Sequence, residues 1–291
     1  MGTAFSSNLL KSGFEVAGYD VAGDRMDVLE AAGGIRAASP AAVAAQCDAV
    51  ITALPSVAAL EEVVSGGEGL VTGSHPGLAV IEMSTFPLDA KEEARAALQP
   101  KGTVVIDAPV SGTGLQAAAA EVVIYASGDS EAIANAAPIF DTIGKETFDL
   151  GAFGNGSILK FLANLLVSVH NLATAEAFVL GMKAGLDPQQ ILDVLSAGVG
   201  SSRILEIRGP MMVANTYEPA AARLKMFIKD LTVIGDFARN LGAPTPLLDA
   251  SLPLYEHAVA LGLGEQDAAA LCALLEEQAG IVRSMLPSTH T

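Results

Sequence analysis

The sequence predicts an α/β domain with a doubly wound parallel sheet, followed by an all-helical domain. Up to about residue 150, short β-branched apolar runs alternate with alanine-rich helical stretches. After about residue 155 the strand-like runs stop, and long helical patterns separated by glycine and proline fill the remainder. Continuous apolar strands alternating with helices are typical of a parallel sheet that is covered on both faces. We therefore predict domains over residues 1–153 and 154–291.

The individual elements follow from the same patterns. Strands are expected at 14–20, 48–54, 78–84, 103–108, 121–126 and 146–150, and intervening helices at 23–33, 57–65, 87–98 and 129–141. In the second domain, glycine and proline mark helix ends and starts. The helices expected there are 156–186, 188–197, 217–241, 245–262 and 266–286.

Composition excludes several classes of protein. A net charge of -17 argues against nucleic acid or an anionic membrane as a partner. Cys47 and Cys272 are too far apart for a disulfide framework, and the scattered histidines predict no metal site. The most apolar stretch, 158–175, is interrupted by Lys160 and other polar residues, which predicts a buried helix and not a membrane span. Without a signal-peptide pattern, the expected compartment is the cytoplasm.

The first twenty residues predict the second half of a Rossmann-type dinucleotide-binding unit. Gly2 matches only the third glycine of G-x-G-x-x-G, so the first two glycines and the first strand are missing. Gly2 would allow close packing at a helix start, and Asp20 would bind ribose hydroxyls, which favours NAD over NADP. Alternatively, Gly2 is a flexible terminal residue and Asp20 a turn residue. Either the protein starts upstream, or its sheet has a gap.

The helix from about residue 157 carries the strongest indication of chemistry. Apart from the titratable His170, Lys160 is the only charged side chain between residues 156 and 175. It belongs to a polar stripe with spacings of three and four, namely Ser157, Lys160, Asn164, Ser168 and Asn171. A solvated face normally carries several charges, so this stripe favours the wall of a polar ligand site. A partly desolvated lysine suits proton exchange with a hydroxyl, and Asn164 could hold the same oxygen while hydride passes to a nicotinamide.

Two strand ends and one later helix supply further candidates. In residues 106–114, IDAPVSGTG, backbone N–H groups and the Ser111 hydroxyl could receive a carboxylate, although such turns are common. Ser84 or Thr85 is expected to be an N-cap of the next helix. Lys229 and Asp230 lie in an apolar helical run, where they form either a surface ion pair or a second cation of the site.

Together these residues resemble the β-hydroxyacid dehydrogenase family, which includes 3-hydroxyisobutyrate dehydrogenase, 2-hydroxy-3-oxopropionate reductase and L-threonate dehydrogenase. The resemblance covers essentially the whole chain. DAPVSGT is similar to the family's D-A-P-V-S-G-G, which implies that Ser111 and Gly112 hold the substrate carboxylate. GNGSILKFLAN is similar to G-x-G-x-x-x-K-x-x-N-N, which implies Lys160 as general acid/base and Asn164 as a substrate-orienting amide. The KDL segment implies that Lys229 neighbours the nicotinamide and substrate.

The resemblance also implies the remainder of the site and the assembly. Leu54, Pro55 and Thr85 would line the cofactor, and the family usually forms dimers or tetramers. Two residues depart from the family pattern in or near the substrate pocket. Thr113, a further substrate-binding candidate, replaces a glycine and adds bulk and a hydroxyl beside the carboxylate. Ala163 replaces an asparagine, so the substrate of any one member does not transfer.

The predicted function is an NAD(P)-dependent oxidoreductase that interconverts a small 2- or 3-hydroxyacid and its oxo acid or semialdehyde. An imine reductase shares the architecture but lacks a lysine at the position of Lys160, and 6-phosphogluconate dehydrogenase needs a longer helical domain. A non-catalytic metabolite-binding or scaffold protein stays open because the cofactor motif is incomplete. His170 and 201–210 loosely resemble the threonate branch, where Arg208 would reach an anionic tail or form an interdomain or subunit ion pair.

Overall fold

The computed structural model describes residues 1–283 and divides the chain into two compact units, Met1–Lys160 and Phe161–Thr291. The first unit is α/β and the second is helical, which confirms the predicted fold class. The predicted boundary at 153/154 falls just before helix α10 (Asn155–Lys183). This helix begins in the first unit and continues into the second, and the two units divide within it.

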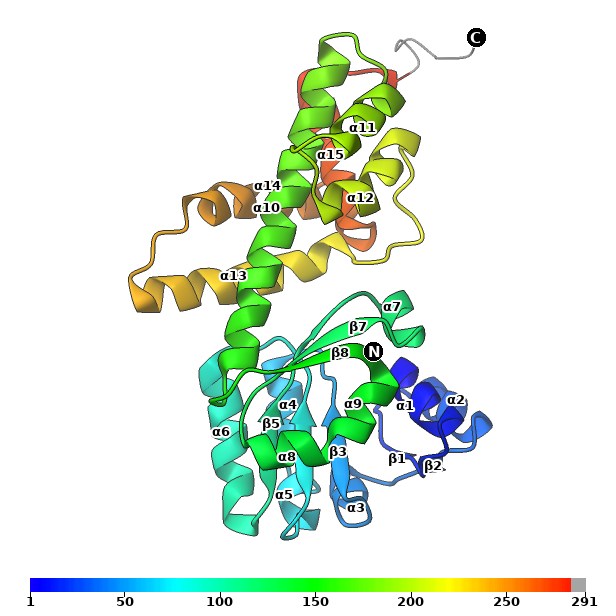
Figure 1. Cartoon of the computed structure of the whole chain (residues 1–291), viewed down its shortest axis with the longest axis vertical. Helices are drawn as coiled ribbons and strands as arrows, with labels where there is room; N and C mark the ends of the chain where they lie inside the picture. The colour runs from blue at the N-terminus through cyan, green and yellow to red at the C-terminus, as the bar shows by residue number, and fades with distance from the viewer. Residues whose placement is uncertain (284–291) are drawn as a thin grey trace. The chain divides into compact units, whose positions relative to one another are not determined.

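The first unit contains two separate sheets in which all strands are parallel (Figure 1). One pairs β1 (Ala17–Gly18) with β2 (Ile35–Arg36), and the other contains β3 (Ala49–Thr52), β4 (Ala79–Glu82) and β5 (Val104–Asp107). Among the described residues, no strand pairs with both β1 and β3. The sheet is therefore interrupted where the sequence predicted a missing strand.

Burial on both faces explains why the central strands are continuous apolar runs. Ile81 and Ile106 belong to one buried cluster, together with Phe140 of α9 (Ala137–Ile143). Val80 and Val105 point to the opposite cluster. Successive side chains of a strand point to opposite faces, so every residue of these runs must be apolar to fill both clusters.

A third sheet completes the first unit. It contains β6 (Val110–Ser111), antiparallel to β7 (Val122–Ala126), and β8 (Gly144–Asp149), parallel to β7. The predicted helix at 129–141 is two helices, because Pro138 starts a new one after the first has ended. The remaining helices are α1 (Gly2–Lys11), α2 (Gly23–Ala31), α3 (Pro40–Ala44), α4 (Val57–Ser65), α5 (Leu70–Gly73), α6 (Leu88–Leu98), η1 (Gln99–Lys101), α7 (Gly114–Ala118) and α8 (Ser130–Asn135).

The second unit packs shorter helices around its part of α10 (Figure 1). They are α11 (Pro188–Ala197), α12 (Arg203–Ala214), α13 (Leu224–Leu241), α14 (Pro246–Ala260), η2 (Leu263–Glu265), η3 (Ala268–Ala270) and α15 (Leu271–Ala279). The sequence did not predict α12, which contains Pro210, and placed the start of α13 too early. Within the described residues, α10 alone is long and apolar enough to cross a membrane. Its fully buried Asn171 and Phe178 are typical of a core helix.

Candidate active site

Four of the predicted cofactor residues of the first unit follow the carboxyl ends of parallel strands. Asp20 lies two residues after β1, Leu54 and Pro55 follow β3, and Thr85 follows β4. Because ligands of open α/β sheets bind outside this edge, the fold brings these positions to the side where a dinucleotide is expected.

Asp20 and Gly2, both predicted at the cofactor, have different surroundings in the structure. Asp20 is exposed, and its Oδ1 accepts a hydrogen bond of 2.9 Å from the N–H of Ala22, so it also shapes the turn. Gly2 is the first residue of α1, but a Cβ added there would meet no atom within 4 Å. The close packing predicted for Gly2 is therefore wrong for the described residues.

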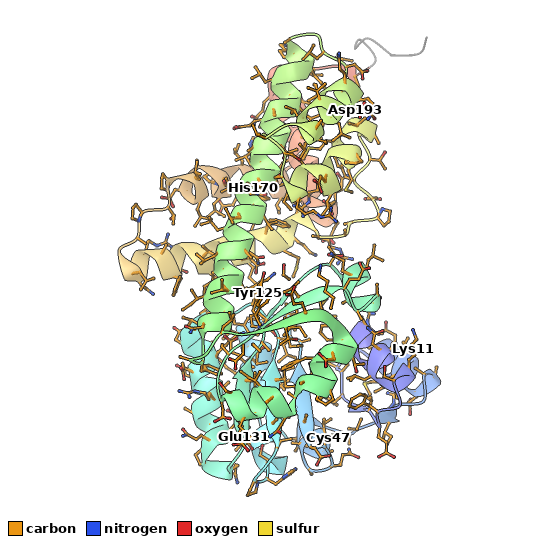
Figure 2. All side chains as sticks on the ribbon, in the orientation of Figure 1. Lys11, Cys47, Tyr125, Glu131, His170 and Asp193 are labelled. Carbon is orange, nitrogen blue, oxygen red and sulfur yellow. The ribbon has the colours of Figure 1, made fainter. Side chains whose placement is uncertain are left out.

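An open pocket beside α1 contains two cationic side chains. Its volume is about 350 Å³, and Lys11 and Arg25 supply its cationic side chains. Lys11 projects from the end of α1 (Figure 2). The full lining is Met1, Thr3, Ala4, Ser7, Asn8, Lys11, Arg25 and Ala118. Lys11 ends α1, and Arg25 Nε lies 3.9 Å from Asp24 Oδ2, so this pocket shows local positive charge only. The fit to a dinucleotide rests on the positions that follow β1, β3 and β4.

The turns after β3 and β4 are tied together by Ser84. The N–H of Leu54 donates a hydrogen bond of 2.8 Å to Ser84 Oγ. Helix α6 begins after Pro87 and has no side-chain cap, so the prediction that Ser84 or Thr85 caps this helix is wrong. Ser84 instead fixes the turn that contains Leu54 and Pro55.

The predicted carboxylate loop has two fixed positions. Gly112 has φ +146°, and a Cβ there would lie 2.8 Å from Cγ1 of Val122, so glycine is required. Thr113 is the N-cap of α7, where its Oγ1 accepts from the N–H of Gln116 while Gln116 Oε1 accepts from the Thr113 N–H. The Thr113 hydroxyl, expected beside the substrate, therefore caps α7. Ser111 has the partly exposed hydroxyl of this loop.

The first turn of α10 is anchored on the sheet by Asp107 and Ser127. Asp107 Oδ2 accepts from the Ser157 N–H at 2.8 Å, and Oδ1 accepts from Ser157 Oγ at 2.8 Å. Ser127 Oγ accepts from the Gly156 N–H at 2.9 Å. Amides at a helix start have no partner within the helix, so these contacts replace the missing ones.

Lys91, which the sequence did not single out, completes this anchor. Its Nζ lies 2.6 Å from Glu82 Oε2 and 2.7 Å from Asp107 Oδ1. Burial opposes the charge of Lys91, but the carboxylates of Glu82 and Asp107 outweigh it and raise its pKa. In the sequence, Lys91 looks like an ordinary exposed helix residue. The available signal was that Glu82 and Asp107 each end a buried apolar run, where a carboxylate needs a counter-charge.

Lys160 and Asn164 lie one turn apart on α10, and both are half-buried. Within the second unit, Asn164 Nδ2 donates to Asp230 Oδ2 at 2.8 Å, and Asp230 Oδ1 lies 3.2 Å from Lys229 Nζ. Two predicted site residues, Asn164 and Lys229, are thus brought together through Asp230. The sequence had not assigned Asp230 this role.

The remaining members of the polar stripe are structural, so the prediction that they line a ligand site is wrong. Ser157 is bound to Asp107, and Ser168 donates to the carbonyl of Asn164. Asn171 Nδ2 donates to Tyr255 Oη at 3.0 Å and to the carbonyl of Ala268 at 2.9 Å. These three side chains are buried and hold α10 in place.

Arg208 also has an internal partner. Its Nε donates to Asp267 Oδ1 at 3.1 Å, and both side chains are buried within the second unit. This pairing replaces the alternatives that the sequence left open, an anionic ligand tail or an interdomain or subunit ion pair.

Comparison with known proteins identifies the family. The profile of the NAD binding domain of 6-phosphogluconate dehydrogenase matches residues 1–151, and that of NAD-binding of NADP-dependent 3-hydroxyisobutyrate dehydrogenase matches residues 154–275. L-threonate dehydrogenase of Cupriavidus necator is 34% identical over 272 residues, which cover 93% of this chain and 91% of that protein. This chain belongs to the β-hydroxyacid dehydrogenase family.

Other members of the β-hydroxyacid dehydrogenase family agree. NAD-dependent L-serine dehydrogenase of Pseudomonas aeruginosa is 30% identical over 92% of this chain and 92% of that protein. The structure of Mycobacterium tuberculosis 3-hydroxyisobutyrate dehydrogenase with L-serine has a TM-score of 0.87 and 28% identity, covering 94% of this chain and 95% of that chain. An imine reductase from Pseudomonas sp., at 20% identity and TM-score 0.61, shares the fold. This β-hydroxyacid dehydrogenase is a nicotinamide-dependent oxidoreductase of hydroxyacids.

Proposed function

We propose that this enzyme interconverts a small 2- or 3-hydroxyacid and its oxo acid or semialdehyde, with NAD as cofactor and Lys160 as general acid/base. The observation that carries the proposal is the placement of Lys160. It is a half-buried lysine one turn beyond a buried helix anchor, with Asn164 on the next turn. The motifs around Lys160 and Ser111, and the hydroxyacids in the names of relatives, support the same reaction.

Different residues of the chain transfer the proton, orient the substrate oxygen and bind the substrate carboxylate. The bound nicotinamide supplies the hydride acceptor for oxidation and the hydride donor for reduction. In oxidation, neutral Lys160 Nζ accepts the proton of the substrate hydroxyl as the C–H bond breaks; in reduction, the Lys160 ammonium returns a proton to the carbonyl oxygen. Asp230 orients the amide of Asn164, which we assign to the same substrate oxygen. Ser111 and Gly112 bind the substrate carboxylate, and Lys229 adds positive charge near the nicotinamide.

NAD is proposed over NADP because of Asp20. This exposed carboxylate follows β1, where an acidic side chain accepts hydrogen bonds from ribose hydroxyls and repels a 2'-phosphate. The start of α1 is assigned to the pyrophosphate, with Leu54, Pro55 and Thr85 along the cofactor. Fluorescence titration should show tighter binding of NADH than NADPH, and Asp20→Asn should reduce that preference several-fold. Tighter NADPH binding by the unaltered chain would overturn this assignment.

The reaction itself is tested by NAD⁺ reduction with a panel of hydroxyacids. L-threonate, L-serine, 3-hydroxyisobutyrate and 2-(hydroxymethyl)glutarate are the natural panel, because relatives are named for them. Turnover of at least one is expected. No turnover together with no NADH binding would favour the non-catalytic alternative, and reduction of a cyclic imine alone would favour an imine reductase.

We also propose a cytoplasmic homodimer or homotetramer that binds neither nucleic acid nor membrane. Leu162 and Leu166 of α10 are 51% and 52% exposed. They lie four residues apart on one helix face, and exposed apolar side chains that lie together often mark a subunit contact. Light scattering after size exclusion tests the assembly, and a monomer at micromolar concentration would contradict it.

A further inference from the structure

Three ionisable side chains are buried together at the carboxyl ends of β4 and β5. Glu82, Lys91 and Asp107 are 2%, 1% and 0% exposed. Burying charges is costly, and apolar residues of similar volume often stabilise a core equally well. Stability alone therefore gives a weak reason for this ionic cluster in the middle of the unit.

The cluster is hydrogen-bonded to the first turn of α10. Glu82 and Asp107 are register partners on adjacent parallel strands, so their carboxylates lie side by side, and Lys91 Nζ contacts both. Lys91 donates to Asp107 Oδ1, the same oxygen that accepts from Ser157 Oγ. Asp107 Oδ2 accepts from the Ser157 N–H and from Ser127 Oγ, the latter at 3.2 Å. Lys91 thus fixes the Asp107 carboxylate, which accepts hydrogen bonds from the N–H and the hydroxyl of Ser157.

The start of α10 has no freedom to shift against this anchor. A Cβ added to Gly156 would lie 2.1 Å from the Tyr125 carbonyl oxygen and 2.9 Å from that of Asp107. The helix backbone therefore lies directly on the ends of β5 and β7. Lys160 follows Ser157 by three residues on the same helix face, about one turn along the axis.

The geometry points to Lys91 as a positioning residue that fixes the location and orientation of Lys160. It acts through Asp107 and Ser157. This inference rests on the proposed function, because it assigns Lys160 the proton transfer. Lys91 itself lies in the buried core of the unit, and it acts through the hydrogen bonds of the helix start. A displacement of Lys160 by a fraction of an ångström is enough to lower turnover, since proton transfer needs hydrogen-bond contact.

A double-mutant cycle tests the inference, with kcat measured on the hydroxyacid that turns over fastest. Ser157→Ala removes the Oγ contact but keeps the backbone N–H. It should lower kcat about 10-fold while KM stays within about 2-fold, and it should shift the acid/base limb of the pH profile. In a Lys160→Ala background, Ser157→Ala should have no further effect, because the group that it positions is gone.

A second variant tests Lys91 at constant net charge of the cluster, leaving Asp107 with only its hydrogen bonds from Ser157 and Ser127. The pair Lys91→Met and Glu82→Gln removes one positive and one negative group, so the net charge of the cluster is unchanged. It should lower kcat in the same way as Ser157→Ala and again have no effect in the Lys160→Ala background. Lys101→Met, a change of an exposed lysine just beyond α6, is the matched control and should keep full turnover.

The outcomes separate this inference from the proposed function. If Lys160→Ala abolishes most turnover but the Ser157 and Lys91/Glu82 variants keep the wild-type kcat and pH profile, the positioning role is overturned and the proposed function stands. If their losses persist in full in the Lys160→Ala background, the anchor does not act through Lys160 and the inference is also overturned. Full turnover of Lys160→Ala itself would overturn both.

Discussion

Two regions of α10 are held by different kinds of polar network. The start of the helix, in the first unit, is bound by the carboxylate of Asp107, which is paired with Lys91. The middle of the helix, in the second unit, is bound by neutral groups. There Tyr255 Oη donates to the Ser168 carbonyl at 3.1 Å and accepts from Asn171 at 3.0 Å.

The two networks have different roles: the neutral one satisfies buried polar groups, and the charged one fixes the position of the helix start. Neutral hydrogen bonds are sufficient to satisfy buried polar groups in a helical core, and each contributes about 0.5–1.5 kcal/mol. Charge-assisted bonds are shorter and stronger, but the charges must be desolvated. The charged network lies one turn before Lys160, whereas the neutral network begins one turn after Asn164 and continues away from Lys160. We infer that the ionic network is retained for position.

The largest loss of stability is expected for Lys91→Met alone. This change leaves the buried carboxylates of Glu82 and Asp107 without their counter-charge, and the free energy of unfolding should fall by about 3–5 kcal/mol. Urea unfolding measures it. Adding Glu82→Gln should recover much of the loss, and a loss under about 1 kcal/mol in the single variant would show that the cluster is weakly coupled to the fold.

A smaller loss is expected for Gly156→Ala. The new Cβ would be 2.1 Å from the Tyr125 carbonyl oxygen, so the start of α10 must move away from β7. Overpacking of this kind costs about 1–3 kcal/mol, and turnover should fall because Lys160 moves with the helix. Gly67→Ala is the control, since a Cβ there meets no atom within 4 Å. Equal thermal midpoints for the two variants would contradict the tight contact.

The smallest effect is expected in the neutral network, from Tyr255→Phe. Loss of the hydroxyl leaves Asn171 without one partner and should cost about 1–2 kcal/mol, with kcat of the folded enzyme unchanged. A reduced kcat at unchanged KM would show that both networks position the site.

The same variant has a characteristic pH dependence. Burial raises the pKa of Tyr255 from 10 to about 12. Between these values the unfolded chain loses the proton that the folded chain keeps, so wild-type stability should fall as pH rises through this range. Below pH 10 the contribution is constant. The difference in unfolding free energy between wild type and Tyr255→Phe should therefore shrink above pH 10, and a constant difference would contradict the assignment.

The sequence predicted those elements whose apolar pattern is set by burial. Strands β3, β4, β5 and β7 were predicted within about two residues because they are apolar runs with at least one fully buried face. Ile35–Arg36 is an exposed strand of two residues that exists only through pairing with β1, so no apolar pattern marks it. Helix α12 was missed because Pro210 interrupts its pattern, although the structure keeps it helical.

Candidate site residues can be proposed from the sequence where a polar residue interrupts an apolar pattern. Lys160 and Asn164 met this condition, because α10 is otherwise apolar. Lys91 did not, because its burial is created by the ends of two strands that are distant in sequence. The same limit explains Ser157, Ser168 and Asn171, whose spacing matched that of Lys160 although their partners make them structural.

The central claim is that Lys160 transfers the substrate proton, and the most direct measurement is kcat of Lys160→Ala beside its affinity for NADH. We predict a fall in kcat of about 10²–10⁴-fold, because general acid/base catalysis contributes that much, with NADH binding near that of the unaltered enzyme. Turnover within about 2-fold of the unaltered enzyme would contradict the account.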